Sequence, residues 1–392
     1  MNAGAKNCER LNQMTMSYKD FDNEEFVHNF EVAEAKVNTL KRCTRCILPE
    51  TFPFIAFDDD GVCNYCHHYK KMKPLGMDAL EQSLQPYKNT NEPIKCIVSF
   101  SGGRDSSYGL HFVKKVLGLD AVALTYDWGV APELARRNQL KMCEKLGVEQ
   151  IVIKANLEKK RENIKANLKA WLKKPNLGTI PVLTSGGQYF FYHANRMAKR
   201  IGRELIVLCA TPLETTYFKT GFSGIAPQFD HRYSLSNKLK LAFNYLGNFI
   251  QNPAYINKSL LDTLGGYFSI YFIPRNQLRL FNYIRWDEDI VNNTLLNKYS
   301  WETSEETSST WRIDDGTVPL TDYMYYMMSG LTINDTFRSN QIREGKLTRD
   351  EALRIVRREN QPRFNAIQWY CDIIKIDFES TLRTINHAHK LY

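Results

Sequence analysis

The segment SFSGGRDSSYG, residues 99–109, combines two adjacent glycines with an aspartate and several serines, directly after an apolar run. Because Gly102 and Gly103 lack a Cβ, the backbone there can turn sharply and come close to a ligand. Free N–H groups and the dipole at the start of the helix expected next attract phosphate. Hydroxyl donors are available on Ser101, Ser106 and Ser107. The segment therefore predicts a phosphate-binding loop, with an ordinary glycine turn as the alternative.

The elements around this loop predict an α/β fold. Apolar runs indicate strands at residues 94–100, 120–127, 149–155 and 204–210. Amphipathic patterns indicate helices at residues 105–117 and 132–146. Continuous apolar strands that alternate with helices are typical of a parallel sheet covered on both faces. Ligands of such sheets lie at the carboxyl ends of the strands, which is where the glycine loop stands.

The loop fits neither G-x-x-x-x-G-K-[ST] nor G-x-G-x-x-G. It resembles instead the S-G-G-x-D-S loop of the ATP pyrophosphatase (PP-loop) superfamily, whose members split ATP between the α and β phosphates. The matching residues are Ser101, Gly102, Gly103, Asp105 and Ser106. The resemblance implies an adenine nucleotide alpha hydrolase-like, Rossmann-like domain, in which Asp105 helps to hold Mg²⁺ near the pyrophosphate.

The same resemblance widens the expected ATP site. Within the loop it includes Ser99, Arg104 and Ser107. At the end of the second strand, Tyr126 and Asp127 would frame adenine and ribose, and a helix-capping role for Asp127 is equally open.

Four cysteines form a second motif, C-x2-C-x16-C-x2-C, at Cys43, Cys46, Cys63 and Cys66. Two such pairs are typical of a tetrahedral Cys₄ zinc site, and iron is the alternative. Four protein thiolates leave no open coordination position, so the site is expected to be structural. Asp58 and its neighbours offset the nearby basic residues, which favours a zinc-ribbon-like docking platform over a nucleic-acid surface.

Later segments supply weaker candidates. TSGGQYFFYH at residues 184–193 offers Ser185 and Gly186 for phosphate or sugar, and capping of the next helix by Thr184 or Ser185 is equally open,. CATPLETTYFKTG at residues 209–221 follows the fourth strand. It offers Thr211 and Glu214, with a proline-set turn as the alternative.

Two further stretches contribute charge. NDTFRSNQIREGK at residues 334–346 offers Arg338 as a catalytic cation for the departing pyrophosphate, against a solvated helix face,. WRIDDG at residues 311–316 offers Asp314 and Asp315, either as turn carboxylates or as sugar-hydroxyl acceptors.

Several stretches together resemble one family, the N-acetyl sugar amidotransferases of bacterial surface polysaccharide, O-antigen and flagellin sugar clusters. They are KRCTRCILPETFP, DDDGVCNYC, SFSGGRDSSYGL, TYDWGVAPELARRNQLKMCEKLGV, TSGGQYFFYHANRMAKR and FRSNQIREGKLTRDEAL. The family's implied reaction uses ATP, Mg²⁺ and ammonia to turn an acetamido group into an acetamidino group, with release of AMP. The ammonia would come from a separate glutaminase subunit, resembling that of imidazole glycerol phosphate synthase, with a possible cyclase-like partner.

The whole chain is consistent with a cytoplasmic enzyme. It has 392 residues and a formal charge of +9, which suits ATP or a sugar nucleotide but also fits nucleic acid,. It has no apolar run long enough for a membrane span and no apolar signal core at its start, so a cytoplasmic location is expected. The nine cysteines then indicate thiols or metal ligands more than disulfides,.

Five regions are expected along the chain. They are an N-terminal arm at 1–40, the Cys₄ module at 41–72, the ATP-binding domain at 90–215, an aromatic-rich insertion for substrate or partner at 216–300, and a helical region that completes the site at 301–392. Residues 154–174 carry eight basic and two acidic residues, which favours an amphipathic surface helix over an RNA or anionic-partner site,.

Two other functions compete with the amidotransferase. A PP-loop tRNA thiolation enzyme would adenylate a base oxygen and deliver sulfur, but no third C-x2-C pair follows the loop. A non-enzymatic zinc-ribbon module would not need a glycine loop on a parallel sheet. Nucleic acid is therefore not the expected partner.

Overall fold

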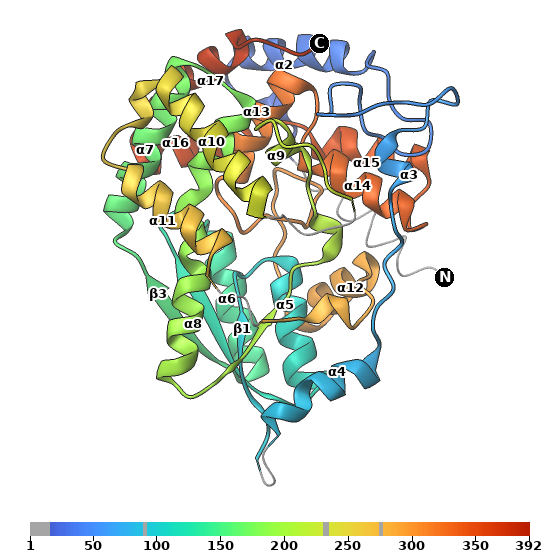
Figure 1. Cartoon of the computed structure of the whole chain (residues 1–392), viewed down its shortest axis with the longest axis vertical. Coiled ribbons are helices and arrows are strands. Elements are labelled where there is room, and N and C mark those ends of the chain that lie inside the picture. The colour runs from blue at the N-terminus through green and yellow to red at the C-terminus, as the bar shows by residue number, and fades with distance from the viewer. Residues whose placement is uncertain (1–15, 89–91, 230–234, 274–276) are drawn as a thin grey trace.

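The computed structural model describes residues 16–88, 92–229, 235–273 and 277–392. Its centre is a sheet of five parallel strands in the order β3-β2-β1-β4-β5 (Figure 1). The strands are β1 Lys95–Ser99, β2 Asp120–Asp127, β3 Glu149–Lys154, β4 Leu205–Leu208 and β5 Leu278–Arg279. The four predicted strands and the parallel α/β class are confirmed. The two-residue strand β5 is not among the predicted strands.

The helices in chain order are α2 Glu24–Val37, α3 Asn64–His67, α4 Met77–Leu84, α5 Arg104–His111, α6 Glu133–Leu146, α7 Leu157–Lys173, α8 Phe190–Arg200, α9 Phe218–Gly221, α10 Leu235–Gln251, α11 Leu260–Tyr271, α12 Glu288–Tyr299, α13 Val318–Ser329, α14 Ile333–Arg343, α15 Arg349–Glu359, α16 Phe364–Ile374 and α17 Phe378–His387. Short 3₁₀ segments are η1 Tyr18–Asp20, η2 Gln85–Tyr87, η4 Leu177–Tyr189, η5 Pro212–Glu214, η6 Pro253–Tyr255 and η7 Leu280–Asn282. Within the described ranges, none of these helices combines the length and the apolar character needed to cross a membrane.

Helices cover both faces of the sheet. On one face, Ile97 of β1 packs in a small cluster with Ala194 of α8. The next strand residue, Val98, belongs to the main core together with Leu110 of α5 and Met142 of α6. Because side chains of a strand alternate between faces, α8 lies on one side of the sheet and α5 and α6 on the other.

Both predicted helices form, with one change. The helix expected at residues 105–117 is α5 followed by a π-helical segment, η3 Phe112–Val116. The helix expected at residues 132–146 is α6, and Gly147 ends it with φ +61, a left-handed conformation that glycine adopts without strain,.

The two ends of the chain pack together. Ile47 of the cysteine-rich segment packs against Ala352 and Val356 of α15, and Arg42 lies 2.8 Å from Asp335 of α14. Figure 1 shows this blue segment beside the orange-red helices α14 and α15. The predicted N-terminal cysteine module and helical C-terminal region are thus confirmed, and they form a single packed unit. Cys8 of the predicted arm lies outside the described residues.

Candidate active site and metal centre

The glycine loop connects β1 to α5, as its sequence predicts. Gly102 has φ +84, and a Cβ there would lie 2.4 Å from the backbone oxygen of Ala135. Two side chains hold the carbonyl groups of the loop. Gln139 donates to Ser101 O at 2.8 Å, and Trp301 Nε1 donates to Gly102 O at 3.1 Å. Position 102 therefore requires glycine for both conformation and space.

A cavity of about 1670 Å³ opens at the carboxyl ends of the strands. Ser99 and Ser101 of the loop line it, as do Tyr126 at the end of β2 and Arg279 at the end of β5. The cavity therefore lies where a parallel α/β sheet binds its ligands.

Two carboxylates, Asp105 and Glu214, lie together next to the loop. Asp105 Oδ1 accepts from Arg104 Nε at 2.9 Å and from Trp286 Nε1 at 3.0 Å, whereas Oδ2 receives no donor from the described residues. Glu214, in η5 after β4, lies close enough to Asp105 for the two carboxyl groups to interact. Burial and the negative charge of Asp105 raise the pKa of Glu214 to about 8,. Adjacent carboxylates, one with an unpaired buried oxygen, are a donor set that fits Mg²⁺.

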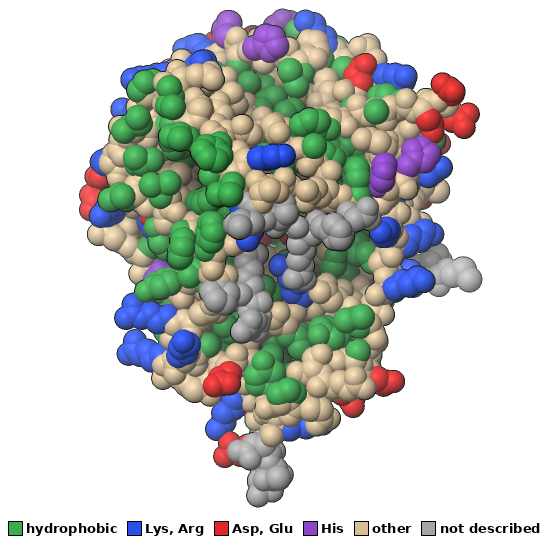
Figure 2. Space-filling view, in the orientation of Figure 1, with side chains coloured by type: hydrophobic (Ala, Val, Ile, Leu, Met, Phe, Trp, Pro, Cys, Tyr) green, Lys and Arg blue, Asp and Glu red, His purple; other side chains and the backbone are tan. Residues whose placement is uncertain are grey.

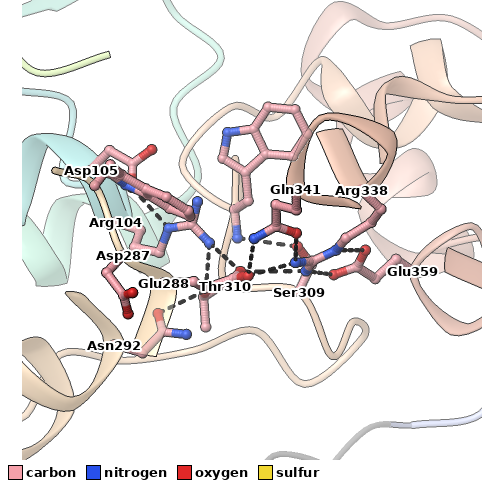
Figure 3. Close-up of polar contacts among 12 residues, drawn as sticks. Arg104, Asp105, Asp287, Glu288, Asn292, Ser309, Thr310, Arg338, Gln341 and Glu359 are labelled. Carbon is pink, nitrogen blue, oxygen red and sulfur yellow. Dashed lines mark hydrogen bonds and ion pairs between the residues drawn. The ribbon is translucent and has the colours of Figure 1, made fainter. Parts of the chain in front are cut away.

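A buried chain of ion pairs stands behind Asp105 (Figure 3). Arg104 Nη1 lies 2.7 Å from Glu288 Oε1, and Glu288 Oε2 lies 2.5 Å from Arg338 Nη1. Arg338 also pairs with Glu359. Burial alone would raise the pKa of Glu288, but the positive charges of Arg338 and Arg104 outweigh burial and lower it to about 2,. The chain of pairs ties α5 to α12, α14 and α15.

This network corrects the interpretation of three predicted phosphate contacts. Arg338 donates to Glu288, Glu359 and Gln341 and lines no part of the cavity. Arg104 is 1% exposed and likewise lies off the cavity wall. Ser107 is fully buried within α5. These side chains lie in the core, so the geometry makes Arg104 and Arg338 positioning residues for Asp105 and does not support their contact with phosphate.

The residues predicted to frame adenine have different surroundings. Tyr126 lines the cavity and stacks on His193 with ring centroids 4.9 Å apart. Asp127 is buried, and both of its carboxylate oxygens are occupied, by Gly129 N at 3.0 Å and Arg136 Nη1 at 2.8 Å. Asp127 therefore stabilises the turn after β2. This structural role is similar to the helix-capping role predicted as the alternative to ligand contact.

The second glycine pair lies in η4. Ser185 lines the cavity, whereas Gly186 packs against Trp128, whose Cε3 would lie 2.8 Å from a Cβ at position 186. The capping alternative is wrong, because α8 begins only at Phe190 and its N-terminus has no side-chain cap. Thr211 is buried and accepts a hydrogen bond from Leu213 N at the start of η5, so it positions the segment that carries Glu214.

Two cations at the cavity wall are not among the residues predicted from the sequence. Lys219 and Arg312 both line the cavity. Burial and the positive charge of Arg312 lower the pKa of Lys219 to about 8, and Lys219 forms no ion pair within the described ranges. Arg312 lies 3.0 Å from Asp315. Their positions in the sequence could have indicated them as site residues, since Lys219 stands shortly after Glu214 and Arg312 precedes the Asp314–Asp315 pair.

Asp314 lies directly against the glycine loop. It lines the cavity, and its Oδ1 would lie 2.4 Å from a Cβ at Gly103. Burial raises the pKa of Asp314, and a hydrogen bond with Ser101 opposes that rise. Because φ of Gly103 is −73, the glycine there is required by the closeness of Asp314 and not by the backbone.

The four cysteines meet as predicted. Their Sγ atoms all lie within 4.8 Å of one another, with Cys43–Cys66 at 3.9 Å and Cys46–Cys63 at 3.7 Å. Four thiolates bound tetrahedrally to one Zn²⁺ would stand about 3.8 Å apart. The arrangement therefore fits a single metal ion, whereas the thiolates of an iron–sulfur cluster bind separate iron atoms and must stand further apart.

One arginine faces the sulfur atoms. Arg343 of α14 places Nε 3.3 Å from Cys66 Sγ and Nη2 3.2 Å from Cys46 Sγ. Arg349 of α15 donates to the carbonyl oxygens of Cys43 and Cys46. Such outer contacts orient ligands and offset the charge of thiolates.

Comparison with known proteins adds little to what the geometry of the chain shows. No family model and no curated protein matches the sequence. Among solved structures, an NH3-dependent NAD synthetase from Campylobacter jejuni has 14% identity and a TM-score of 0.26, over 50% of this chain and 95% of that chain. The U34-tRNA thiolase NcsA from Methanococcus maripaludis, with its [4Fe-4S] cluster, has 12% identity and a TM-score of 0.30, over 90% of each chain. The fold and the site therefore rest on the geometry of this chain.

Proposed function

We propose that this chain is an ATP-dependent, AMP-forming amidotransferase that converts the acetamido group of a bacterial sugar or sugar nucleotide into an acetamidino group. The observation that carries the proposal is the Asp105–Glu214 pair next to the glycine loop. The pair itself does not line the cavity of about 1670 Å³, but Ser99 and Ser101 before Asp105 and Pro212 and Thr215 on either side of Glu214 do. The loop would hold the pyrophosphate, and Mg²⁺ bound by the two carboxylates would neutralise its negative charge. The cavity extends far enough from the loop to hold a second substrate.

The chemistry explains the need for ATP. An amide carbon is a poor electrophile, and its oxygen is a poor leaving group. Transfer of AMP to the amide oxygen releases pyrophosphate and gives an imidate-like adenylate. Ammonia then attacks the carbon and loses a proton, AMP leaves with the oxygen, and the amidine remains.

The chain's own residues have assignable roles in this proposal. Lys219 and Arg312 line the cavity and replace Arg338 as the candidate cations for the phosphates,. Tyr126 offers a ring face for adenine, and Ser99 and Ser101 offer hydroxyl groups. The buried arginines behind Asp105 keep its carboxylate in place.

Partners and metal follow from the same proposal. Water competes with ammonia for the activated carbon, so ammonia is best delivered internally by a glutaminase subunit, with a possible cyclase-like partner, in the cytoplasm. Zn²⁺ on the cysteine quartet would hold the cysteine-rich segment against α14 and α15, because four thiolates leave no open position for a substrate. Mg²⁺ and ATP would act only at the sheet.

The cysteines outside the quartet argue against sulfur transfer. No cysteine lines the cavity in the part of the chain that the structure describes. Burial raises the pKa of the thiol of Cys143 to about 11 and that of Cys371 to about 12. Reactive thiols are instead exposed and have lowered pKa values.

The test is nucleotide analysis with the purified protein. ATP, Mg²⁺, an ammonium salt and a UDP-linked diacetamido sugar are expected to yield AMP, pyrophosphate and an amidino product. Asp105→Asn should abolish AMP release, whereas Asp78→Asn, an exposed aspartate in the first turn of α4, should leave it unchanged. Release of ADP would contradict the proposal, and a thiolated tRNA that disappears on gene deletion would favour tRNA thiolation.

A further inference from the structure

The helices α10 and α11 expose an unusual amount of apolar surface. Of the twenty large apolar side chains that are exposed within the described residues, nine lie between positions 239 and 272. They are Leu239, Phe243, Leu246, Ile250, Ile256, Leu261, Leu264, Phe268 and Phe272, and we call them the α10–α11 face. Figure 2 shows green side chains gathered over these two helices. The surface is larger than scattered exposed hydrophobic residues would produce.

On α10 the apolar residues form one stripe that points outward. Leu239, Phe243, Leu246 and Ile250 are separated by four, three and four positions, which is the spacing of a single helix face. Phe243 and Ile250 are each 67% exposed. Asparagines lie on the inward side, where Asn237 is buried and Asn244 donates to Ser223 O at 2.6 Å.

The helix α11 also exposes large apolar residues. Leu261, 81% exposed, and Phe268, 56% exposed, face outward. The inward side is made of small residues. Ser269 donates to Gln188 O at 2.7 Å, and a Cβ at Gly266 would lie 2.3 Å from Ser185 O. The helix α10 also buries Leu241 and Phe249 in the core, so it is apolar on two sides. Both helices expose large apolar residues in a continuous stripe, whereas a helix on a water-facing surface has polar residues on its outer face.

The charge around the face is positive. The sole acidic residue in positions 235–273 is Asp262, and it is paired with Lys160 of α7. Lys240 on α10 is exposed. The basic helix α7 lies beside the pair of helices, since Lys174 at its end donates to Gln251 at 3.1 Å and Asn252 donates to Ala170 O at 2.7 Å.

We propose that the α10–α11 face docks this protein on the surface of a lipid bilayer that contains anionic lipids. Helices that lie in a bilayer interface have a large apolar face, lysines beside it and no membrane span. A protein partner is less suitable, because the hot spots of protein interfaces are enriched in tryptophan, tyrosine and arginine and poor in leucine, whereas four of the nine residues of this face are leucines and none is tryptophan, tyrosine or arginine,. Four of its residues, Leu246, Ile250, Ile256 and Leu264, also line the cavity, so the bilayer would lie at the cavity mouth. The proposal does not depend on the ATP chemistry proposed above.

Vesicle co-sedimentation of the full chain tests the docking. The protein is expected to bind phosphatidylcholine vesicles that contain about one quarter phosphatidylglycerol, and to bind them less tightly in high salt. Phe243→Glu/Phe268→Glu should weaken binding by more than about tenfold, because two apolar side chains are lost from the buried face. Leu140→Glu changes a leucine that is 66% exposed on α6 and should leave binding unchanged.

Two further measurements keep the test decisive. Circular dichroism melts should show all variants folded, because the substituted side chains are exposed. Light scattering without lipid should show the same oligomeric state for the wild type and for Phe243→Glu/Phe268→Glu. No vesicle binding by the wild type, equal loss of binding in Leu140→Glu, or a dimer that Phe243→Glu/Phe268→Glu dissociates would each overturn the proposal, the last by showing that a second copy covers the face.

Discussion

Two partly buried glutamates near Asp105, Glu214 and Glu288, should respond oppositely to the same substitution. Glu214 has its pKa raised to about 8 by burial and by the negative charge of Asp105. Glu288 has its pKa lowered to about 2, because two arginines outweigh the effect of burial. Replacing either residue by glutamine keeps its shape and removes its charge. We therefore expect Glu214→Gln to stabilise the fold and Glu288→Gln to destabilise it.

The magnitudes follow from proton linkage. In the unfolded chain both carboxyls have a pKa near 4.5. Folding at pH 7 must place a proton on Glu214, and the interval from pH 4.5 to pH 7 makes this cost about 3 kcal/mol. The cost appears as pH rises above 4.5, so the gain of Glu214→Gln should be about 1 kcal/mol at pH 5 and about 3 kcal/mol at pH 7.

The pKa shift of Glu288 has the opposite effect on the free energy of unfolding. Its lowered pKa contributes about 3 kcal/mol of stability that is fully present above pH 4.5 and is lost as pH falls toward 2. Glu288→Gln should lose this contribution at pH 7. The loss should be larger still if Arg104 and Arg338 are left without compensation, since breaking a buried pair costs about 3–5 kcal/mol.

Urea unfolding followed by circular dichroism, without added Mg²⁺, measures both effects at pH 5 and pH 7. Glu214→Gln should also lose AMP formation while its free energy of unfolding rises, which separates loss of chemistry from loss of fold. The reasoning would be refuted if Glu214→Gln destabilised the protein at pH 7, or if its gain did not grow between pH 5 and pH 7. A stability of Glu288→Gln equal to that of the wild type would contradict the role of the ion-pair network.

Three further changes test the site. Gly103→Ala should destabilise the fold by about 1–3 kcal/mol in thermal melts, because its Cβ meets Asp314, and Asp314→Ala should restore most of this loss,. Lys219→Met should raise the KM for ATP at pH 7; the wild type should approach the variant above pH 8, where Lys219 loses its charge, and equal KM values at pH 7 would count against its phosphate role. Cys63→Ser should lose bound metal and melt at a lower temperature, while Cys143→Ser keeps the metal; a metal-free, fully active Cys63→Ser would contradict a structural site,.

The features that depend on short stretches of sequence were the most predictable. The strands β1, β2 and β4 are confirmed because apolar runs of this kind are buried on both faces of a parallel sheet,. The strand β3 is also confirmed, although it lies at the edge of the sheet and none of its residues is buried. The loop at Gly102 and the cysteine pairs are local motifs whose spacing carries their geometry. Strand β5 was missed, because two residues carry no periodic pattern.

The sequence did not predict which charged side chains pair with one another. The basic stretch at residues 334–346 predicts Arg338 as a cation for the departing pyrophosphate, yet Arg338 pairs with Glu288, 50 positions earlier. Arg104, inside the loop motif, pairs with the same glutamate across 184 positions. The large apolar residues of α10 and α11 belong to the segment predicted as an aromatic-rich insertion for substrate or partner. Their exposure is not predictable, because periodicity shows a stripe but not whether it faces the core or the solvent.

The sequence by itself determined the strands β1 to β4, the helices α5, α6 and α7, the glycine turn at the end of β1 and the cysteine set, because each depends on local conformation or on short spacing. Only the tertiary structure decided which charges meet. It brought Asp105 to Glu214, turned Arg104 and Arg338 away from the cavity, and placed Lys219 and Arg312 on its wall. The physical reason is that a buried charge is stable only beside an opposite charge or a hydrogen-bond partner, and that partner is supplied by whichever distant segment the fold packs against it.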